Sequence, residues 1–316
     1  MTEPILVADI GGTNARFAIA ERTGGGPPML RDFAQFSTGD FSRFEDALGA
    51  YLDQTSAHPK KACFAAAGPA NGKTLKFTNS PWRLEKHELQ KHFEIISLKI
   101  VNDFYALAVG VQNIDPAGCR RLLKGTALSG APRIVMGPGT GFGQAIITPH
   151  DSGFTTTSTE GGHARFSPVT DEETRLCEEV ARSRRPVTVE DLLSGPGVVR
   201  IYAALCAIGD HDVVFETAQS ISEAAIASTD KIAARTIELF WTLSARVAGE
   251  CVLTTGARGG VFLGGGILPR ITGFFHEETF SAAFIDRRVM SHFVAATPVY
   301  LITAEDTSLI GAATLA

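Results

Sequence analysis

The sequence predicts an α/β fold built from two related halves. Apolar runs rich in β-branched residues alternate along the chain with amphipathic runs of helical period, which is typical of sheets covered by helices. Residues 5–20 and residues 133–148 also share one arrangement, in which an apolar run, a Gly/Thr turn and a second apolar run follow one another. Each arrangement predicts a β-hairpin. Two matched hairpins so far apart indicate a duplicated domain rather than a short repeat.

Size and composition favour a cytoplasmic enzyme of two domains. A chain of 316 residues is long enough to bury two cores, and its net charge of −5 gives no support to a nucleic acid or an acidic membrane as partner. No apolar run approaches the roughly 20 residues that span a bilayer, and the first apolar run lacks the flanks of a signal peptide. The five cysteines are scattered and never spaced as Cys-x-x-Cys, so we expect neither disulfides nor a structural zinc site.

Beyond the two hairpins, the periodicity predicts further helices and strands. In the first half these are helices at residues 41–54, 84–93 and 104–111, and strands at residues 61–67 and 98–101. In the second half they are helices at residues 172–182, 197–208, 223–227, 231–253 and 308–315, and strands at residues 259–266 and 298–303. Between the halves, residues 113–132 are rich in Pro, Gly and basic residues and are predicted to cross between domains.

The two Gly/Thr turns are candidates for binding phosphate. A tight turn without Cβ atoms lets backbone N–H groups approach an anion closely, and threonine hydroxyls add donors. The first turn is Gly11-Gly12-Thr13-Asn14, and the second contains Gly139-Thr140-Gly141. Arg16 could add positive charge to the first turn. The alternative, that each is only a hairpin turn that requires glycine, fits a single turn better than a matched pair.

Asp9 ends the first predicted strand, directly before the first turn. A carboxylate beside a phosphate is repulsive unless a cation lies between them, so Asp9 predicts Mg²⁺, held through water. The sequence lacks the Gly-x-x-x-x-Gly-Lys-Ser/Thr motif of P-loop enzymes. It also lacks a Gly-x-Gly-x-x-Gly run opening a helix after the first strand, and the protein-kinase motifs.

Polar residues at three further places are candidates for a substrate site. Asn102 and Asp103 follow a strand, at the end where α/β proteins form their sites, so Asp103 is a candidate general base for a substrate hydroxyl. The alternative is that Asp103 caps the following helix. Glu160-Gly-Gly-His163 suits a loop wrapped against a small polar ligand. Glu190 starts a helical pattern, and its alternative is a surface acid favoured by the helix dipole.

Taken together, these segments resemble the bacterial glucokinase family, within the superfamily of hexokinase, actin and Hsp70 folds. The resemblance is carried by an ordered set of motifs at residues 9–16, 77–82, 101–104, 137–143, 160–163, 193–197 and 260–270. It implies a duplicated actin/hexokinase-like (ribonuclease H-like) two-domain fold with an active-site cleft. The small domain would comprise residues 1–112 and 304–316 and the large domain residues 113–303, usually in a homodimer.

The resemblance also implies a reaction and the residues that perform it. The reaction is the ATP-dependent phosphorylation of D-glucose to glucose 6-phosphate in glycolysis, with Asp103 as the catalytic base. The residues matching those that bind glucose are Asn79, Asn102, Asp103, Glu160, His163 and Glu190. Those matching the ATP site are Asp9, Gly11, Gly12, Thr13, Asn14, Gly139, Thr140, Gly141 and Gly265, the last facing the adenosine.

Several alternatives stay open. A kinase for fructose, mannose or N-acetylglucosamine would use the same polar groups in another geometry. Asp103 disfavours a non-catalytic sugar-sensing module, and the set of Glu160, His163 and Glu190 disfavours an actin-like ATPase. The related ROK kinases carry a zinc-binding His/Cys cluster near the Glu-x-x-His loop, whereas here only Cys177 lies near, so no zinc is expected. The donor (polyphosphate or ADP in place of ATP), the oligomer interface and regulation are not specified by the sequence.

Overall fold

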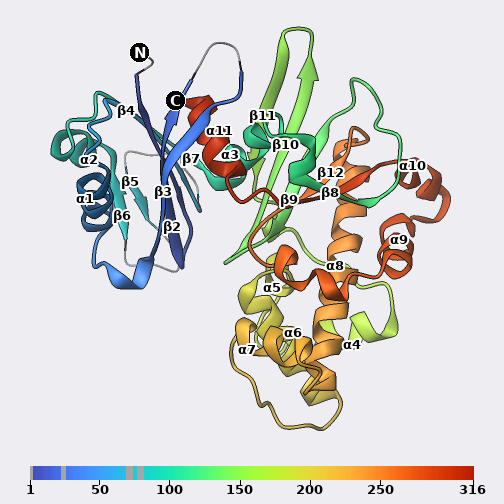
Figure 1. Cartoon of the computed structure of the whole chain (residues 1–316). Helices are drawn as coiled ribbons and strands as arrows, with labels where there is room; N and C mark the ends of the chain where they lie inside the picture. Colours follow the sequence, from blue (N-terminus) through green and yellow to red (C-terminus); the bar gives the residue numbers. More distant parts are fainter. Residues whose placement is uncertain (1–2, 23–25, 69–73, 77–81) are drawn as a thin grey trace. The chain divides into compact units, whose positions relative to one another are not determined.

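A computed structural model of the chain describes residues 3–22, 26–68, 74–76 and 82–316 (Figure 1). The chain divides into two compact units, a first unit of Met1–Gly118 with Ala304–Ala316 and a second unit of Cys119–Thr303. Each unit contains a mixed β-sheet with helices packed against it, so the predicted α/β class is confirmed. None of the described helices is long and apolar enough to cross a membrane.

The first unit is organised around a five-stranded sheet in the order β3-β2-β1-β4-β7. Its strands are β1 (Ile5–Ile10), β2 (Asn14–Glu21), β3 (Met29–Ser37), β4 (Lys61–Ala66) and β7 (Ser97–Asn102). As predicted, β1 and β2 form an antiparallel hairpin. The structure also shows that β1, β4 and β7 run parallel. A separate short pair consists of β5 (Thr74–Lys76) and β6 (Arg83–Glu85).

Helices bury both faces of this sheet, which is why every residue of β1 is buried and all but Asp9 are apolar. On one face, Leu6, Ala8 and Ile10 pack in one core cluster with residues of α1 (Phe44–Thr55) and α2 (Lys86–His92). On the other face, alternate residues of β1 pack with α11 (Thr307–Leu315), beside α3 (Asp103–Val111). The last helix of the chain therefore belongs to the core of the first unit.

Two glycines allow α3 and α11 to touch backbone to backbone. A Cβ at Gly311 would collide with the carbonyl oxygen of Ala106, and a Cβ at Gly110 would collide with that of Thr307. We expect Gly311→Ala to lower the free energy of unfolding by about 1–3 kcal/mol, because the two helices must separate. Urea denaturation measures this, with Gly273→Ala as control because nothing lies within 4 Å of a Cβ there. Equal stability of the two variants would contradict the prediction.

The second unit repeats the strand order of the first. Its sheet has the order β11-β10-β9-β12-β13-β8. The strands are β8 (Cys119–Leu123), β9 (Arg133–Pro138), β10 (Phe142–His150), β11 (Gly153–Thr159), β12 (Val261–Leu263) and β13 (Val299–Ile302). In both sheets three antiparallel strands (β3-β2-β1 and β11-β10-β9) lead into a parallel set (β1-β4-β7 and β9-β12-β13). The predicted duplication is therefore confirmed at the level of topology.

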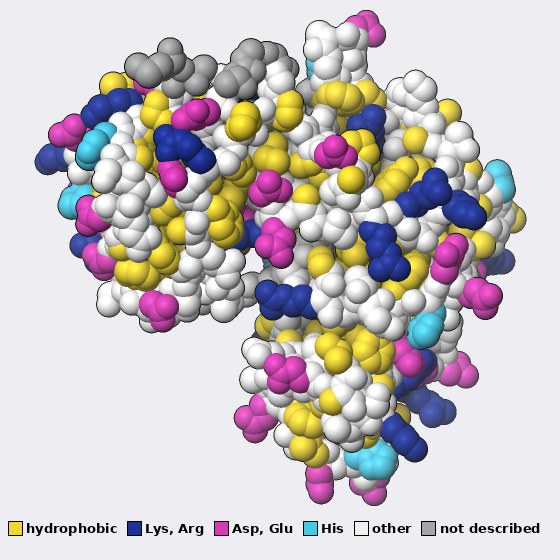
Figure 2. Space-filling model, viewed as in Figure 1, with side chains coloured by type: hydrophobic (Ala, Val, Ile, Leu, Met, Phe, Trp, Pro, Cys, Tyr) yellow, Lys and Arg dark blue, Asp and Glu magenta, His cyan; other side chains and the backbone are white. Residues whose placement is uncertain are grey.

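Helices make up most of the rest of the second unit. They are α4 (Asp171–Val180), α5 (Val189–Leu192), α6 (Gly195–Ile208), α7 (Ala218–Ile226), α8 (Lys231–Thr255), α9 (Glu277–Ile285) and α10 (Ser291–Ala295). The long helix α8 carries the largest share of the core, and its Trp241 indole donates a hydrogen bond to the Ile271 carbonyl at 3.0 Å. On the face drawn in Figure 2, acidic and basic side chains are interspersed over each unit.

Candidate active site

In the first unit, Asp9 and Asn102 come to the same edge of the sheet. The register pairs Asp9 with Ala65, and Ala65 in turn with Val101, the residue before Asn102. Because β1, β4 and β7 are parallel, their carboxyl ends meet at one edge. This edge therefore carries Asp9, the first glycine turn and the start of α3.

Asp9 is buried, with 8% of its surface exposed, and it is ion-paired to Arg16, the residue opposite it on β2. The Arg16 guanidinium also donates a hydrogen bond of 2.7 Å to the carbonyl of Glu305, just before α11. A buried carboxylate needs such a partner, because its desolvation is otherwise costly. The positive charge of Arg16, which was predicted to lie beside phosphate, therefore neutralises Asp9 in this structure.

Hydrogen bonds within the first unit fix the first glycine turn. The Gly11 N–H donates to the Asn14 carbonyl at 2.9 Å, closing the turn. Thr38 donates from its hydroxyl to the Gly12 carbonyl and from its N–H to the Thr13 carbonyl, both at 2.9 Å. The loop is thus held in one shape by its carbonyl groups, and Thr13 is exposed.

The cap of α3 is Asn102 and not Asp103. The Asn102 Oδ1 accepts a hydrogen bond of 3.0 Å from the Tyr105 N–H, and its Nδ2 donates to the Gly68 carbonyl at 3.3 Å. Asp103 is the first residue of the helix, and its Oδ1 accepts from the Phe104 N–H at 2.9 Å. The alternative that Asp103 serves as the helix cap is therefore wrong.

In the second unit, Glu190 lies against the second glycine turn. Its Oε2 accepts a hydrogen bond of 2.7 Å from the Phe142 N–H, and a Cβ at Gly141 would collide with the same oxygen. The turn is also closed by the Gly139 N–H donating to the Gly141 carbonyl at 2.7 Å. Glu190 thus lies in the first turn of α5 and packs against the loop, so it is not only a surface acid favoured by the helix dipole.

The loop of Glu160 and His163 lies beside both β10 and α5. The Glu160 carboxylate and the His163 imidazole are both exposed, and Glu160 Oε2 lies 3.9 Å from His163 Nε2. A Cβ at Gly161 would collide with the Gln144 side chain of β10, so the loop packs directly on that strand. The Val189 N–H donates to the Ala164 carbonyl at 2.9 Å. The second unit therefore brings Glu160, His163, Glu190 and the second turn together.

Gly265 also adjoins the second turn. Its φ of +87° is in the region that favours glycine, and a Cβ there would collide with the Pro138 carbonyl. The glycine run after β12 therefore packs on the strand end that leads into Gly139. Of the predicted site residues, Asn79 lies outside the described residues.

The comparisons with known proteins agree with this arrangement. The family model described as "Glucokinase" matches residues 6–316. The chain belongs to the glucokinase family. The glucokinase of Hahella chejuensis (strain KCTC 2396) is 36% identical over 309 residues, which cover 98% of this chain and 95% of that protein. The glucokinase of Saccharophagus degradans is 34% identical over 98% of this chain and 97% of its own length.

Solved structures of similar proteins have the same fold. A glucokinase from an Antarctic psychrotroph is 33% identical, with a TM-score of 0.85 over 100% of this chain and 99% of that chain. A ROK family glucokinase from Streptomyces griseus, solved with glucose and AMPPNP, is 19% identical, with a TM-score of 0.65 and 99% of both chains covered. Its likeness concerns the fold alone. The predicted family and enzyme class, a glucokinase, are both confirmed.

Within this family frame, the structure adds one residue that the motifs missed. Gln144 is 7% exposed, and its side chain packs against the Glu160 loop at Gly161. Its sequence signal, a single amide inside an apolar strand, was too weak to single it out.

Burial disfavours the reactive thiolate form of Cys63 and Cys177. Burial raises the pKa of the Cys177 thiol to about 11 and that of the Cys63 thiol to about 12. Both therefore stay protonated near neutral pH, whereas the thiolate is the form that binds metals and attacks electrophiles.

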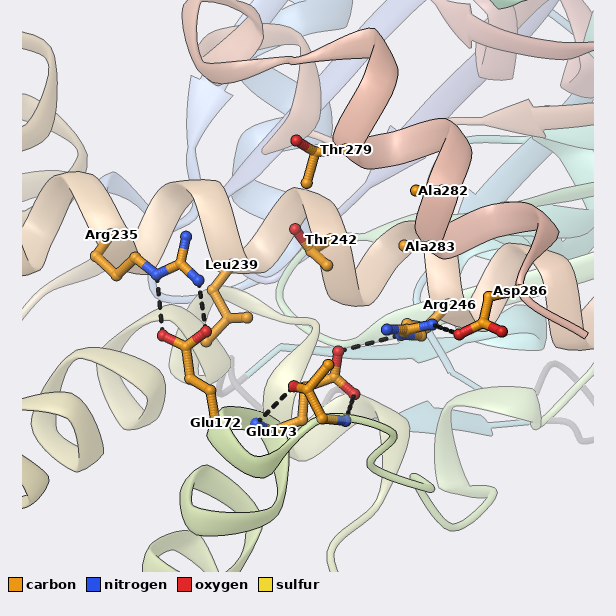
Figure 3. Close-up of a pocket in the computed structure, with 11 residues that line it drawn as sticks. Glu172, Glu173, Arg235, Leu239, Thr242, Arg246, Thr279, Ala282, Ala283 and Asp286 are labelled. Atoms are coloured by element: carbon orange, nitrogen blue, oxygen red, sulfur yellow. Dashed lines mark hydrogen bonds and ion pairs between the residues drawn. The ribbon is translucent and has the colours of Figure 1, made fainter.

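A separate groove of about 520 Å³ in the second unit contains none of the predicted site residues (Figure 3). It lies between α4, α8 and α9, and ion pairs cross it. Arg246 contacts buried Glu173 at 3.1 Å and Asp286 at 2.9 Å. Arg235 donates to Glu172 at 2.9 Å, and this hydrogen bond raises the pKa of the guanidinium further. We interpret the groove as a structural junction that ties α4 and α9 to α8.

Proposed function

We propose that this protein transfers the γ-phosphoryl group of ATP to the 6-hydroxyl of D-glucose, with Asp103 as the general base. Membership of the glucokinase family supports the reaction. The observation that carries the role of Asp103 is its position at the start of α3, at the sheet edge that also bears Asp9 and the first turn. In the transfer, the hydroxyl oxygen bonds to the γ-phosphorus, its proton passes to the Asp103 carboxylate, and ADP leaves.

Six polar side chains are candidates for binding the sugar. We assign hydroxyl contacts to Asn79, Asn102, Asp103, Glu160, His163 and Glu190. Carboxylates accept from hydroxyls, whereas the amide and imidazole groups both donate and accept. The second unit supports this assignment because Glu160, His163 and Glu190 are neighbours there.

The two glycine turns would hold the phosphates of ATP. We assign this role to Gly11, Gly12, Thr13, Asn14, Gly139, Thr140 and Gly141, with Gly265 facing the adenosine. Glu190, which we assign to the sugar, would also lie beside the ATP phosphates, because its carboxylate accepts a hydrogen bond from the backbone of the second turn.

Asp9 would hold Mg²⁺ through water. Among the described residues, no three His, Cys, Asp or Glu side chains are grouped closely enough to enclose a metal ion. A single carboxylate beside a phosphate loop fits Mg²⁺, which keeps several waters and shares its shell with phosphate oxygens. When bound, Mg²⁺ neutralises negative charge that develops on the phosphoryl oxygens.

Three further assignments rest on the family resemblance, and the first of them is also supported by the two compact units. We propose a small domain of residues 1–112 with 304–316 and a large domain of residues 113–303, close to the division into units. We also propose a homodimer and a cytoplasmic location.

Glucose is expected to be the preferred sugar. A site that pairs hydroxyls rejects an analogue that presents them differently, because polar groups of the site then lose their partners. We expect kcat/KM for glucose to exceed that for fructose by at least about tenfold, or about 1.4 kcal/mol. An ADP-release assay over glucose, fructose, mannose and N-acetylglucosamine measures this. Equal or better turnover of fructose would refute the glucose assignment but not the kinase, whereas no ADP release with any sugar would favour the sensing module.

A further inference from the structure

The edge strands of the two sheets differ in how they are protected. An edge strand presents unpaired N–H and C=O groups, and proteins guard such strands with charges, bulges or irregular register. The edges of the larger sheets are β3 and β7 in the first unit, and β8 and β11 in the second. In Figure 1, β11 forms a long hairpin with β10.

Three of these edges carry the expected guards. Strand β3 contains the charged pair Arg31 and Asp32, and its register with β2 is irregular. Strand β8 contains Arg120 and Arg121, with a register shift against β13. Strand β7 contains Lys99, whose ammonium donates to the Leu315 carbonyl. These features make each strand a poor template for pairing with another chain.

Strand β11 has none of these guards. Its sequence, GFTTTST, contains no charged residue and no proline, and its register with β10 is unbroken from Gly153 to Thr159. Thr155, Thr157 and Ser158 are exposed, and 47% of the surface of Phe154 is exposed. Threonine and phenylalanine favour extended structure. Of the four edges in the described part of the chain, this one is the best suited to accept a further strand.

We infer that β11 pairs antiparallel with β11 of a second copy, joining two six-stranded sheets across a twofold axis. This inference rests on the proposed homodimer and names its interface. A strand edge is complementary to another strand, and a twofold interface requires a surface that matches itself. Seven residues pair completely with their symmetry mates only in a register centred on Thr156. Thr155 of one copy then faces Thr157 of the other, a favourable cross-strand pair.

The same strand leads into the sugar loop. β11 ends at Thr159, and the next residue is Glu160, which precedes the turn of His163. Pairing with a second copy would therefore order the strand from which the Glu160 carboxylate is presented. This gives the dimer a role in the site without a residue crossing between copies.

Charge placement on β11 tests the interface. In the double variant Thr155→Lys/Thr157→Lys, like charges face each other twice across the axis, so we expect the dimer dissociation constant to rise at least about tenfold. In Thr155→Lys/Thr157→Glu, each lysine faces a glutamate, so dimerisation should be close to that of the original chain. Gln35→Lys on exposed edge strand β3 is the control and should leave the dimer unchanged. Sedimentation equilibrium gives the dissociation constants, and circular dichroism checks folding.

The outcomes separate this inference from the homodimer itself. An original chain that is monomeric at all concentrations would refute both. A dimer of unchanged affinity in the Lys/Lys variant would refute β11 as the interface but leave the homodimer standing. Weakening by both double variants alike, with folding intact, would also refute the facing of Thr155 and Thr157. None of these measurements depends on kinase activity.

Discussion

Replacing Asp103 by Asn is expected to lower kcat by about 10²–10⁴, the usual contribution of a general base. The amide keeps the size of the carboxylate and a hydrogen bond to the sugar but does not accept the hydroxyl proton. Glucose affinity should change far less than kcat, because the lost interaction develops in the transition state. The pair of measurements is therefore kcat by ADP release and glucose affinity by calorimetry.

Stability distinguishes a chemical role from a structural one. The cap of α3 is supplied by Asn102 through its bond to the Tyr105 N–H, so Asp103→Asn should leave the melting temperature nearly unchanged. Asp46→Asn is a matched control, because Asp46 is also an acid in the first turn of a helix, α1. That variant should keep normal kcat. A folded Asp103→Asn enzyme with near-normal kcat would remove Asp103 from the mechanism.

The sequence predicted the central hairpins and most helices because their signals are local. β1 with β2 and β9 with β10 are apolar runs joined by glycine turns, and each formed as expected. Strands β3, β8 and β11 were missed, because they lie at sheet edges and carry polar or charged side chains in place of a buried apolar alternation. β8 lies inside the predicted crossover of residues 113–132.

The start of one helix was predicted wrongly, again because polar residues take the place of an apolar pattern. The helix expected at residues 223–227 begins at Ala218, because its polar first turn is stabilised by a capping box between Thr217 and Ser220. A hydroxyl-rich turn of this kind has no apolar periodicity to detect.

The motifs identified candidate residues but not what those residues contact. The hydrogen bond from the Phe142 N–H to Glu190 joins residues 48 positions apart, and the bond from Arg16 to the Glu305 carbonyl joins residues 289 positions apart. Such pairs depend on the folded topology, in which α5 adjoins the second turn and the end of the chain returns to β2. No local sequence pattern predicts contacts between residues this far apart along the chain.

Removal of divalent metal is expected to abolish phosphoryl transfer. With excess EDTA, turnover should fall to background, and Mg²⁺ should restore it, because the phosphate oxygens would otherwise face the Asp9 carboxylate without a cation between them. Arg16 already neutralises Asp9, but one guanidinium does not balance the charges of both Asp9 and ATP. The metal requirement should therefore persist despite this ion pair.

A change at Asp9 connects the metal requirement to this site. Asp9→Asn keeps the size of the side chain but removes the charge that attracts Mg²⁺, so half-maximal activity should require at least about tenfold more Mg²⁺. With Mg²⁺ present, calorimetry should show that Asp9→Asn binds ATP more weakly than the original chain does. This measurement does not depend on turnover. Asp46→Asn again serves as control and should show the original Mg²⁺ dependence. Full activity in EDTA would contradict the assignment of Mg²⁺ to Asp9. Stoichiometric zinc in the active purified protein would also contradict it, because the five scattered cysteines of this chain predict no zinc site.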